Sequence, residues 1–166
     1  STMAAHSRVP VINAMSDYFH PCQLLADVLT FIEKRGQIVD AKVAWIGDGN
    51  NVCHSWINAA YQFGFDLQLA CPRGYWPDPK ILEHAGKKVS LMTEPRAAVS
   101  GCDLVVTDTW FSIGKTTEKE ERINACADYC VTESLMREAQ PDALFMHCLP
   151  AYRGTEVSAS VIDGPQ

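Results

Sequence analysis

The chain has 166 residues, 47% of them hydrophobic and 20% charged, with a formal net charge of -6. This predicts one globular unit with a buried core, and the acidic balance without a Lys/Arg cluster argues against a nucleic-acid surface. No apolar run is long enough to cross a bilayer and residues 1–10 do not resemble a secretion signal, so we expect a soluble, cytoplasmic protein without a membrane partner.

The N-terminal part differs from the rest of the chain. Val9–Asn13 looks like a strand. His20–Gly36 is typical of a helix, with Pro21 at its first position and Gly36 at its C-terminal cap. The expected apolar stripe of this helix consists of Leu25, Val28, Leu29 and Ile32. Because a long helix joins this expected strand to the first β-rich run, we expect the N-terminal part to be a piece of another domain.

From Lys42 onward, short β-rich runs alternate with helical patterns, which predicts an α/β fold with a parallel sheet. The expected strands are 42–47, 66–71, 88–92, 103–108, 128–132 and 143–147. The expected helices are 51–63, 78–85, 95–99, 119–127 and 133–139. Consecutive apolar residues, as in Leu104–Val106, indicate a Rossmann-like three-layer sandwich with helices on both faces of the sheet.

Ligands of such sheets bind beyond the carboxyl ends of the strands, so the loops after Gly47, Asp108 and His147 are candidate sites. Gly47 and Gly49 form G-x-G, but Val52 stands where a dinucleotide fingerprint has a third small residue. Asn50 and Asn51 either form the turn and cap the next helix, or offer an amide to a polar ligand.

Asp108 ends a buried strand, where it either caps the following loop or holds a cation such as a substrate ammonium group. Ser112 and Gly114 come next in the same loop. His20 and Gln23 lie three residues apart at a helix start. His20 is either a cap or a packed core residue, or it joins Gln23 in donating hydrogen bonds to a carbonyl or phosphate.

Cys148 is a candidate nucleophile, metal ligand or milder site residue. The neighbouring base, His147, points to the opposite face of a strand, which disfavours a Cys-His proton relay. The Leu149-Pro150 bond can be cis, which would expose backbone carbonyls to a ligand. Seven cysteines form no CxxC pair, so we expect reduced cysteines and no metal site.

Four motifs, HPCQLLAD, GDGNN with a following HS, DTWFSIG and HCLPAYRGTEV, together resemble those of the ornithine carbamoyltransferases. They occur in the family's order and spacing across residues 9–163. The resemblance implies carbamoyl transfer from carbamoyl phosphate to L-ornithine, giving citrulline and phosphate in arginine metabolism. It also implies that the reaction needs no metal or organic cofactor.

The resemblance also implies roles for single residues. His20, Asp108 and Cys148 would take part in catalysis. The residues implied on carbamoyl phosphate are His20, Gln23, Cys148 and Leu149. The residues implied on L-ornithine are Asn51, Asp108, Ser112, Ile113 and Cys148.

The chain departs from the family in two ways. Ile113 and Tyr152 replace a usual Met and a usual His or Arg. More seriously, the Ser-x-Arg-Thr phosphate loop, a later Arg and the C-terminal helix are missing.

The missing parts predict how the chain is divided. Residues 1–19 would be a remnant of a truncated carbamoyl phosphate domain, 20–36 the linking helix and 37–166 the ornithine-binding domain, truncated at its C-terminus. We expect a fragment that is inactive alone and does not trimerise efficiently, although the full-length enzyme would be a homotrimer.

Two other functions fit parts of the sequence. A non-catalytic nucleotide-binding module would use Gly47–Asn51 and leave Cys148 without a role. A carbamoyltransferase paralogue would take an acylated ornithine or another amine, with Ile113 and Tyr152 as its specificity changes.

Overall fold

A computed structural model describes residues 2–111 and 119–165 of the chain. Its centre is a five-stranded parallel sheet in the order β3-β2-β1-β4-β5. The strands are β1 (Lys42–Ile46), β2 (Asp66–Ala70), β3 (Val89–Met92), β4 (Leu104–Thr107) and β5 (Leu144–His147). The helices are α1 (Thr2–His6), α2 (Pro21–Arg35), α3 (Asn51–Phe63), α4 (Pro79–His84), α5 (Pro95–Val99), α6 (Lys119–Cys126), α7 (Glu133–Met136) and α8 (Ala159–Ile162), with 3-10 turns η1 (Gly86–Lys88) and η2 (Ala127–Tyr129).

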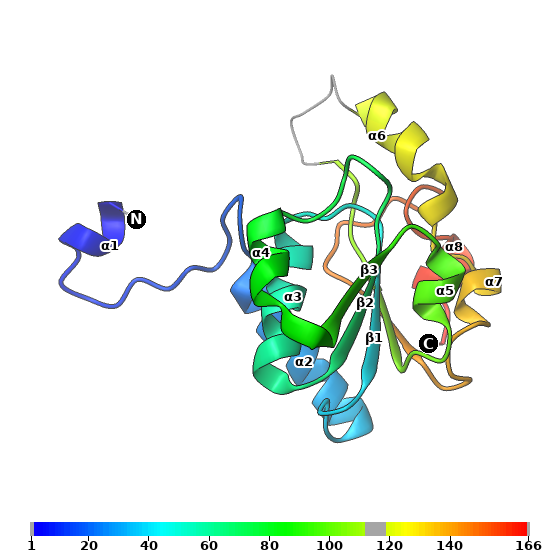
Figure 1. The fold of residues 1–166 in the computed structure, drawn as a ribbon, viewed down its shortest axis with the longest axis horizontal. Helices are drawn as coiled ribbons and strands as arrows, with labels where there is room; N and C mark the ends of the chain where they lie inside the picture. Colours follow the sequence, from blue (N-terminus) through cyan, green and yellow to red (C-terminus); the bar gives the residue numbers. More distant parts are fainter. Residues whose placement is uncertain (1, 112–118, 166) are drawn as a thin grey trace.

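Helices cover both faces of the sheet, which confirms the predicted three-layer α/β fold (Figure 1). α2, α3 and α4 lie on one face, and α5, α7 and α8 lie on the other. β1 supplies both cores alternately: Val43 and Trp45 belong to the core under α3, whereas Ala44 and Ile46 belong to the opposite core. This alternation follows from the two-residue period of a strand, and it explains why β1 is apolar along most of its length.

Local sequence signals fix the position of α3. The Asn50 side chain caps the helix, because its Oδ1 accepts hydrogen bonds from the backbone N–H groups of Val52 and Cys53. Gly64 ends the helix in the left-handed conformation, with φ of 78°. The predicted bounds of this helix are therefore confirmed.

Two predicted strands are wrong. Val9–Asn13 has no strand structure, and its apolar side chains at Val9 and Ile12 are 70% and 79% exposed. A strand needs a neighbour to satisfy its backbone groups, and no described strand lies beside this segment. The segment 128–132 forms only an isolated bridge, between Val131 and Val157, because η2 extends helical structure as far as Tyr129.

The apolar stripe predicted on α2 is only partly covered by the described residues. Leu25, Leu29 and Ile32 are 55%, 56% and 41% exposed, and only Val28 of the predicted four is buried. α2 carries two apolar faces. The face that packs on the domain contains Leu24, Val28 and Phe31, and Asp27 is buried beside them. Sequence periodicity alone does not say which of two apolar faces a neighbour will cover. Among the described residues, no helix is both long enough and apolar enough to span a membrane.

Candidate functional site

The carboxyl ends of β1, β4 and β5 lie at the same end of the parallel sheet, and the strand order reverses between β1 and β4. β1 lies between β2 and β4, and the connections that leave β1 and β4 lead to helices on opposite faces (Figure 1). In open α/β sheets such a reversal leaves a crevice where ligands bind. The residues that directly follow these three strands are Gly47, Asp108 and Cys148.

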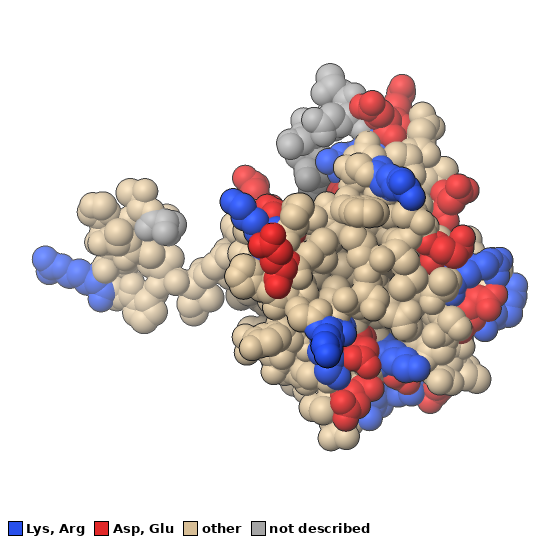
Figure 2. Space-filling view, viewed as in Figure 1, with Lys and Arg blue, Asp and Glu red and all other residues tan. Residues whose placement is uncertain are grey.

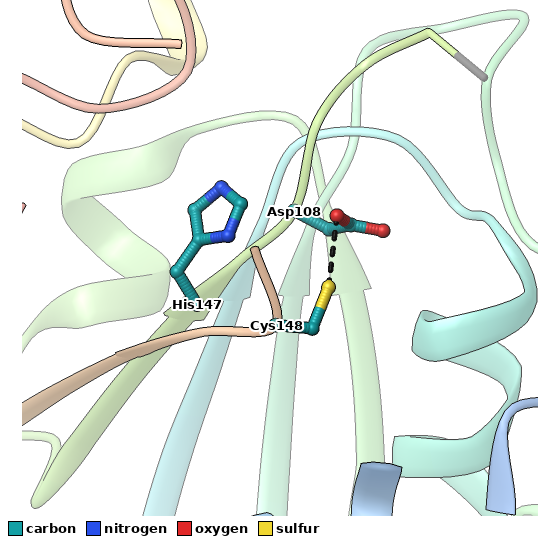
Figure 3. A group of neighbouring side chains, drawn as sticks. All are labelled: Asp108, His147 and Cys148. Carbon is teal, nitrogen blue, oxygen red and sulfur yellow. Dashed lines mark hydrogen bonds between the residues drawn. The ribbon is translucent and has the colours of Figure 1, made fainter. Parts of the chain in front are cut away.

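Asp108 is buried at this edge, with 8% of its surface exposed. Its Oδ1 accepts hydrogen bonds from the Cys148 thiol at 3.0 Å and from the Thr109 N–H at 2.7 Å. Its Oδ2 accepts one from Asn50 Nδ2 at 2.7 Å. Figure 3 shows the Cys148 thiol directed at this carboxylate. These three donors are neutral groups, which leaves a buried negative charge suited to a cationic amine.

Cys148 is a hydrogen-bond donor in this arrangement. Burial raises the pKa of the Cys148 thiol, and the negative charge of Asp108 and its hydrogen bond raise that pKa further. The protonated thiol is a poor nucleophile and a poor metal ligand. We therefore interpret Cys148 as a hydrogen-bond donor that orients the Asp108 carboxylate.

His147 takes no part in this hydrogen bond, and its ring lies to one side of it (Figure 3). One ligand-type atom each from Asp108, His147 and Cys148 falls within 4.8 Å of the others, a grouping with the composition of a metal site. However, His147 Nδ1 accepts from the Leu149 N–H at 2.9 Å, and Nε2 lies 3.2 Å from the Glu156 carboxylate. A cation bound here would have to break one of these contacts and deprotonate Cys148.

His20 directly precedes the first residue of α2. Its side chain does not cap the helix, and its Nδ1 is buried without a hydrogen-bond partner among the described residues. The backbone N–H of His20 donates to Ser55 Oγ at 2.8 Å, which fixes the start of α2 against α3. A buried ring nitrogen without a partner costs free energy unless a ligand completes it, so the geometry favours the ligand-binding interpretation over a cap.

Asp27 is a buried carboxyl group beside Gln23 that the sequence reasoning did not single out. Gln23 Nε2 donates to Asp27 Oδ1 at 2.9 Å, which fixes the orientation of the Gln23 amide. Asp27 is buried, and desolvation raises its pKa to about 6, opposed by the Gln23 hydrogen bond and by the charge of His20. The charge of Asp108 raises this pKa further, which couples Asp27 electrostatically to the carboxyl end of β4.

The two glycines after β1 are needed by the protein's own packing. A side chain on Gly49 would lie 2.2 Å from Pro77 N and 2.5 Å from the carbonyl carbon of Trp76, and the Gly49 N–H donates to Tyr75 O at 2.8 Å. Gly47 has φ of 120°, and a Cβ at this position would lie 2.8 Å from Trp110 Nε1. The second glycine of a dinucleotide turn admits a pyrophosphate, and here the chain itself occupies that space.

Asp48 lies between these glycines and pairs with Arg122 of α6. Arg122 Nη1 donates to Asp48 Oδ2 at 2.6 Å, and its guanidinium carbon lies 5.0 Å from the centre of the Tyr75 ring. Burial raises the pKa of Asp48 to about 6, opposed by the charge and hydrogen bond of Arg122. The pair fixes the β1–α3 loop to α6.

The remaining predicted residues have different outcomes. Asn51 Nδ2 donates to Ser16 O at 2.7 Å, so its neighbour Asn50 is the one that contacts Asp108. Leu149 is exposed, and the Leu149-Pro150 bond is cis as predicted. Ser112 and Ile113 lie outside the described residues.

The charged residues on one face of the molecule are mixed in sign. Figure 2 shows Lys and Arg interspersed with Asp and Glu over the body of the domain on that face. The described residues form no single-sign patch of charge over this face, in keeping with a net charge of only -6 over the chain.

Comparison with models of known protein families identifies the family of this chain. Residues 39–166 match the model of the aspartate/ornithine carbamoyltransferase Asp/Orn binding domain, and residues 1–33 match that of the carbamoyl-P binding domain. The chain belongs to the aspartate/ornithine carbamoyltransferase family. The resemblance carried by the sequence motifs is therefore confirmed.

Individual members of the family are similar over almost the whole chain. The ornithine carbamoyltransferases of Nitrosococcus oceani and Halorhodospira halophila are 61% and 57% identical to it, each over 98% of this chain and 54% of the relative. The solved ornithine carbamoyltransferase of Pyrococcus furiosus is 44% identical with a TM-score of 0.91, over 98% of this chain and 54% of that one. That of Burkholderia thailandensis is 47% identical with a TM-score of 0.90, over 99% and 53%. The chain spans about half the length of the curated relatives it matches.

Proposed function

We propose that this chain forms the L-ornithine side of a carbamoyltransferase site that converts carbamoyl phosphate and L-ornithine to L-citrulline and phosphate. Membership of the family supports the reaction type. The observation that carries the choice of substrate is the buried Asp108 carboxylate, whose donors Asn50, Thr109 and Cys148 are all neutral. A cationic amino group would balance this charge in a desolvated crevice.

In this proposal Asp108 binds the α-ammonium group of L-ornithine, and Asn51 and Ser112 hold its carboxylate end with Ile113. An α-N-acylated ornithine has no α-ammonium group and would leave Asp108 uncompensated, so the same observation disfavours the paralogue. For Asn51 to contact a substrate, its amide must exchange its hydrogen bond to Ser16 O for one to the ligand.

His20 and Gln23 would bind the carbamoyl group. Because Asp27 accepts from Gln23 Nε2, the Gln23 carbonyl oxygen is left as the acceptor for the carbamoyl NH2. His20 would donate to the carbonyl oxygen as negative charge develops there, a type of contact worth about 3 kcal/mol in comparable oxyanion sites. Cys148 and Leu149 would lie beside the carbamoyl group and the reacting δ-amine.

The chemistry follows from these positions. The δ-amine of L-ornithine, after losing its proton, attacks the carbonyl carbon, and the carbon–nitrogen bond forms. The carbon–oxygen bond to phosphate then breaks, and the nitrogen releases its second proton. Holding the two substrates in line supplies much of the acceleration.

We also propose the organisation and setting of the whole protein. Residues 1–19 would belong to a carbamoyl phosphate domain, 20–36 to the linking helix and 37–166 to the ornithine-binding domain. The full-length enzyme would be a cytoplasmic homotrimer, with the exposed face of α2 covered by the rest of the protein. The cysteines at buried, apolar positions are suited to a reducing compartment.

Calorimetric titration of the chain tests the substrate choice. L-ornithine should bind, N2-acetyl-L-ornithine should bind at least about tenfold more weakly, and Asp108→Asn should remove that difference because it removes the charge the ammonium group needs. Equal binding of the two ligands by the unaltered chain would contradict the assignment of Asp108.

A further inference from the structure

A buried hydrogen-bonded pair, His147 and Glu156, contacts the backbone of the turn that carries Cys148. Glu156 is fully buried, and the His147 side chain is 1% exposed. His147 Nε2 lies 3.2 Å from Glu156 Oε1. None of the roles proposed above uses either residue.

The hydrogen bonds of the pair fix which nitrogen of His147 carries its proton. The backbone N–H of Leu149 can only donate, and it lies 2.9 Å from His147 Nδ1, so this nitrogen is an acceptor. Nε2 then carries the proton and donates to Glu156 Oε1. The same Glu156 oxygen accepts from the Tyr152 N–H at 2.5 Å.

These contacts hold the turn at both ends. Leu149 has φ of 59°, which is a left-handed conformation that a leucine rarely adopts, and its side chain is 62% exposed. Apolar packing therefore contributes little to holding Leu149 in this conformation, whereas the hydrogen bond to His147 fixes its backbone. Cys148 lies between these two residues, so the direction of its thiol toward Asp108 depends on both.

Glu156 has a second feature that packing alone does not explain. Its Oε2 is buried without a hydrogen-bond partner among the described residues. A fully buried carboxyl group that is only half satisfied destabilises a fold compared with an apolar residue of similar size. Residues that break such a rule are expected at functional sites, where position matters more than stability.

We propose that His147 and Glu156 are positioning residues that set the Cys148–Leu149 turn, and through it the geometry of the substrate crevice. Glu156 holds His147 and the Tyr152 backbone, and His147 holds the Leu149 backbone. Neither residue touches the substrates. The consequence for ligand affinity rests on the proposed function, whereas the setting of the turn does not.

Four variants test the pair: E156L, E156Q, H147Q and C102A. E156L keeps side-chain size but accepts no hydrogen bond, whereas E156Q keeps an oxygen for both donors. H147Q keeps a donor toward Glu156, but when its amide nitrogen takes the place of Nε2, its amide oxygen points away from the place of Nδ1 and no longer accepts from the Leu149 N–H. C102A is the matched control, because Cys102 is also fully buried and donates to Ala98 O at 3.1 Å near the amino end of β4.

The first readout is hydrogen exchange of single amides, measured by NMR on the chain without ligand. Each lost hydrogen bond should speed exchange about tenfold or more, at Leu149 in H147Q and at Tyr152 in E156L. E156Q should stay within about threefold of the unaltered chain at both amides, and C102A should match it. Unchanged exchange in both H147Q and E156L would overturn the proposal.

The second readout is the dissociation constant for L-ornithine, measured calorimetrically. H147Q and E156L should weaken binding about tenfold or more, whereas E156Q and C102A should stay within about threefold. If a variant had fast-exchanging turn amides but normal affinity for L-ornithine, the claim that the turn sets the affinity of the site would be overturned. If the unaltered chain bound no L-ornithine, the proposed function would fail while the exchange data still decided the positioning role. If E156L did not fold, E156Q and H147Q would carry both readouts.

Discussion

Replacing Asp27 by asparagine should stabilise the chain at neutral pH but not in acid. Burial raises the pKa of Asp27 from 3.8 to about 6 in the folded protein. At about 1.4 kcal/mol per pKa unit, this difference corresponds to roughly 3 kcal/mol of unfolding free energy. The amide introduced by D27N would keep an oxygen to accept from Gln23 Nε2, so the main change is the loss of a buried charge.

The sign follows from proton binding. Because the folded state binds the Asp27 proton more tightly than the unfolded state, this contribution to stability is fully present below about pH 3.8 and is lost as the pH rises through about 6. The stability of D27N relative to the unaltered chain should therefore increase by up to about 3 kcal/mol between about pH 3.5 and about pH 7.5. Any constant offset from the amide itself cancels in this comparison.

Urea unfolding followed by tryptophan fluorescence at several pH values across this range measures the difference. Asp163 supplies a control of opposite sign, because the hydrogen bond and charge of Arg153 lower the pKa of this exposed carboxyl group. D163N should lose a small amount of stability relative to the unaltered chain as the pH rises. A D27N difference that does not change with pH, or that falls as pH rises, would refute the interpretation of Asp27 as a desolvated carboxyl group.

Three further outcomes are expected. At about pH 8, iodoacetamide should modify Cys148 at least about tenfold more slowly than the exposed Cys22, because burial and Asp108 raise the pKa of the Cys148 thiol; peptide mass spectrometry that finds Cys148 labelled first would contradict this. G49A should lower the free energy of unfolding in urea by about 2 kcal/mol or more, because its Cβ would lie 2.2 Å from Pro77 N. G74A, whose Cβ meets no neighbour, should lower it by about 1 kcal/mol. Equal losses in the two variants would contradict the close packing of Gly49. A colorimetric assay of the chain alone with both substrates should show citrulline formation at least about a hundredfold below that of a full-length relative. Comparable rates would contradict the expectation that this chain is inactive alone.

The sheet was predictable because its strands carry strong local signals. β1 and β4 are apolar on consecutive residues, and α3 begins at an Asn cap and ends at a left-handed glycine. The errors occurred where the outcome depends on a neighbour. Val9–Asn13 has strand-like residues without an adjacent described strand, and Leu25 lies on an apolar face of α2 that the described residues leave open.

The site was predictable at the strand ends and less so elsewhere. Position after a buried strand was enough to select Asp108 and Cys148. No periodic pattern identifies Glu156, because a buried glutamate looks like a surface residue in sequence. Asp27 stands within the HPCQLLAD motif, but its role depends on desolvation and on Asp108, which only the folded arrangement brings near.

The central claim is that the crevice beside Asp108 and Cys148 binds L-ornithine and not a nucleotide. Parallel calorimetric titrations of the chain with L-ornithine and with NAD test it most directly, with D108N as the variant that removes the charge. We predict a saturable signal for L-ornithine that D108N abolishes, and none for NAD. Binding of NAD without binding of L-ornithine would contradict the account.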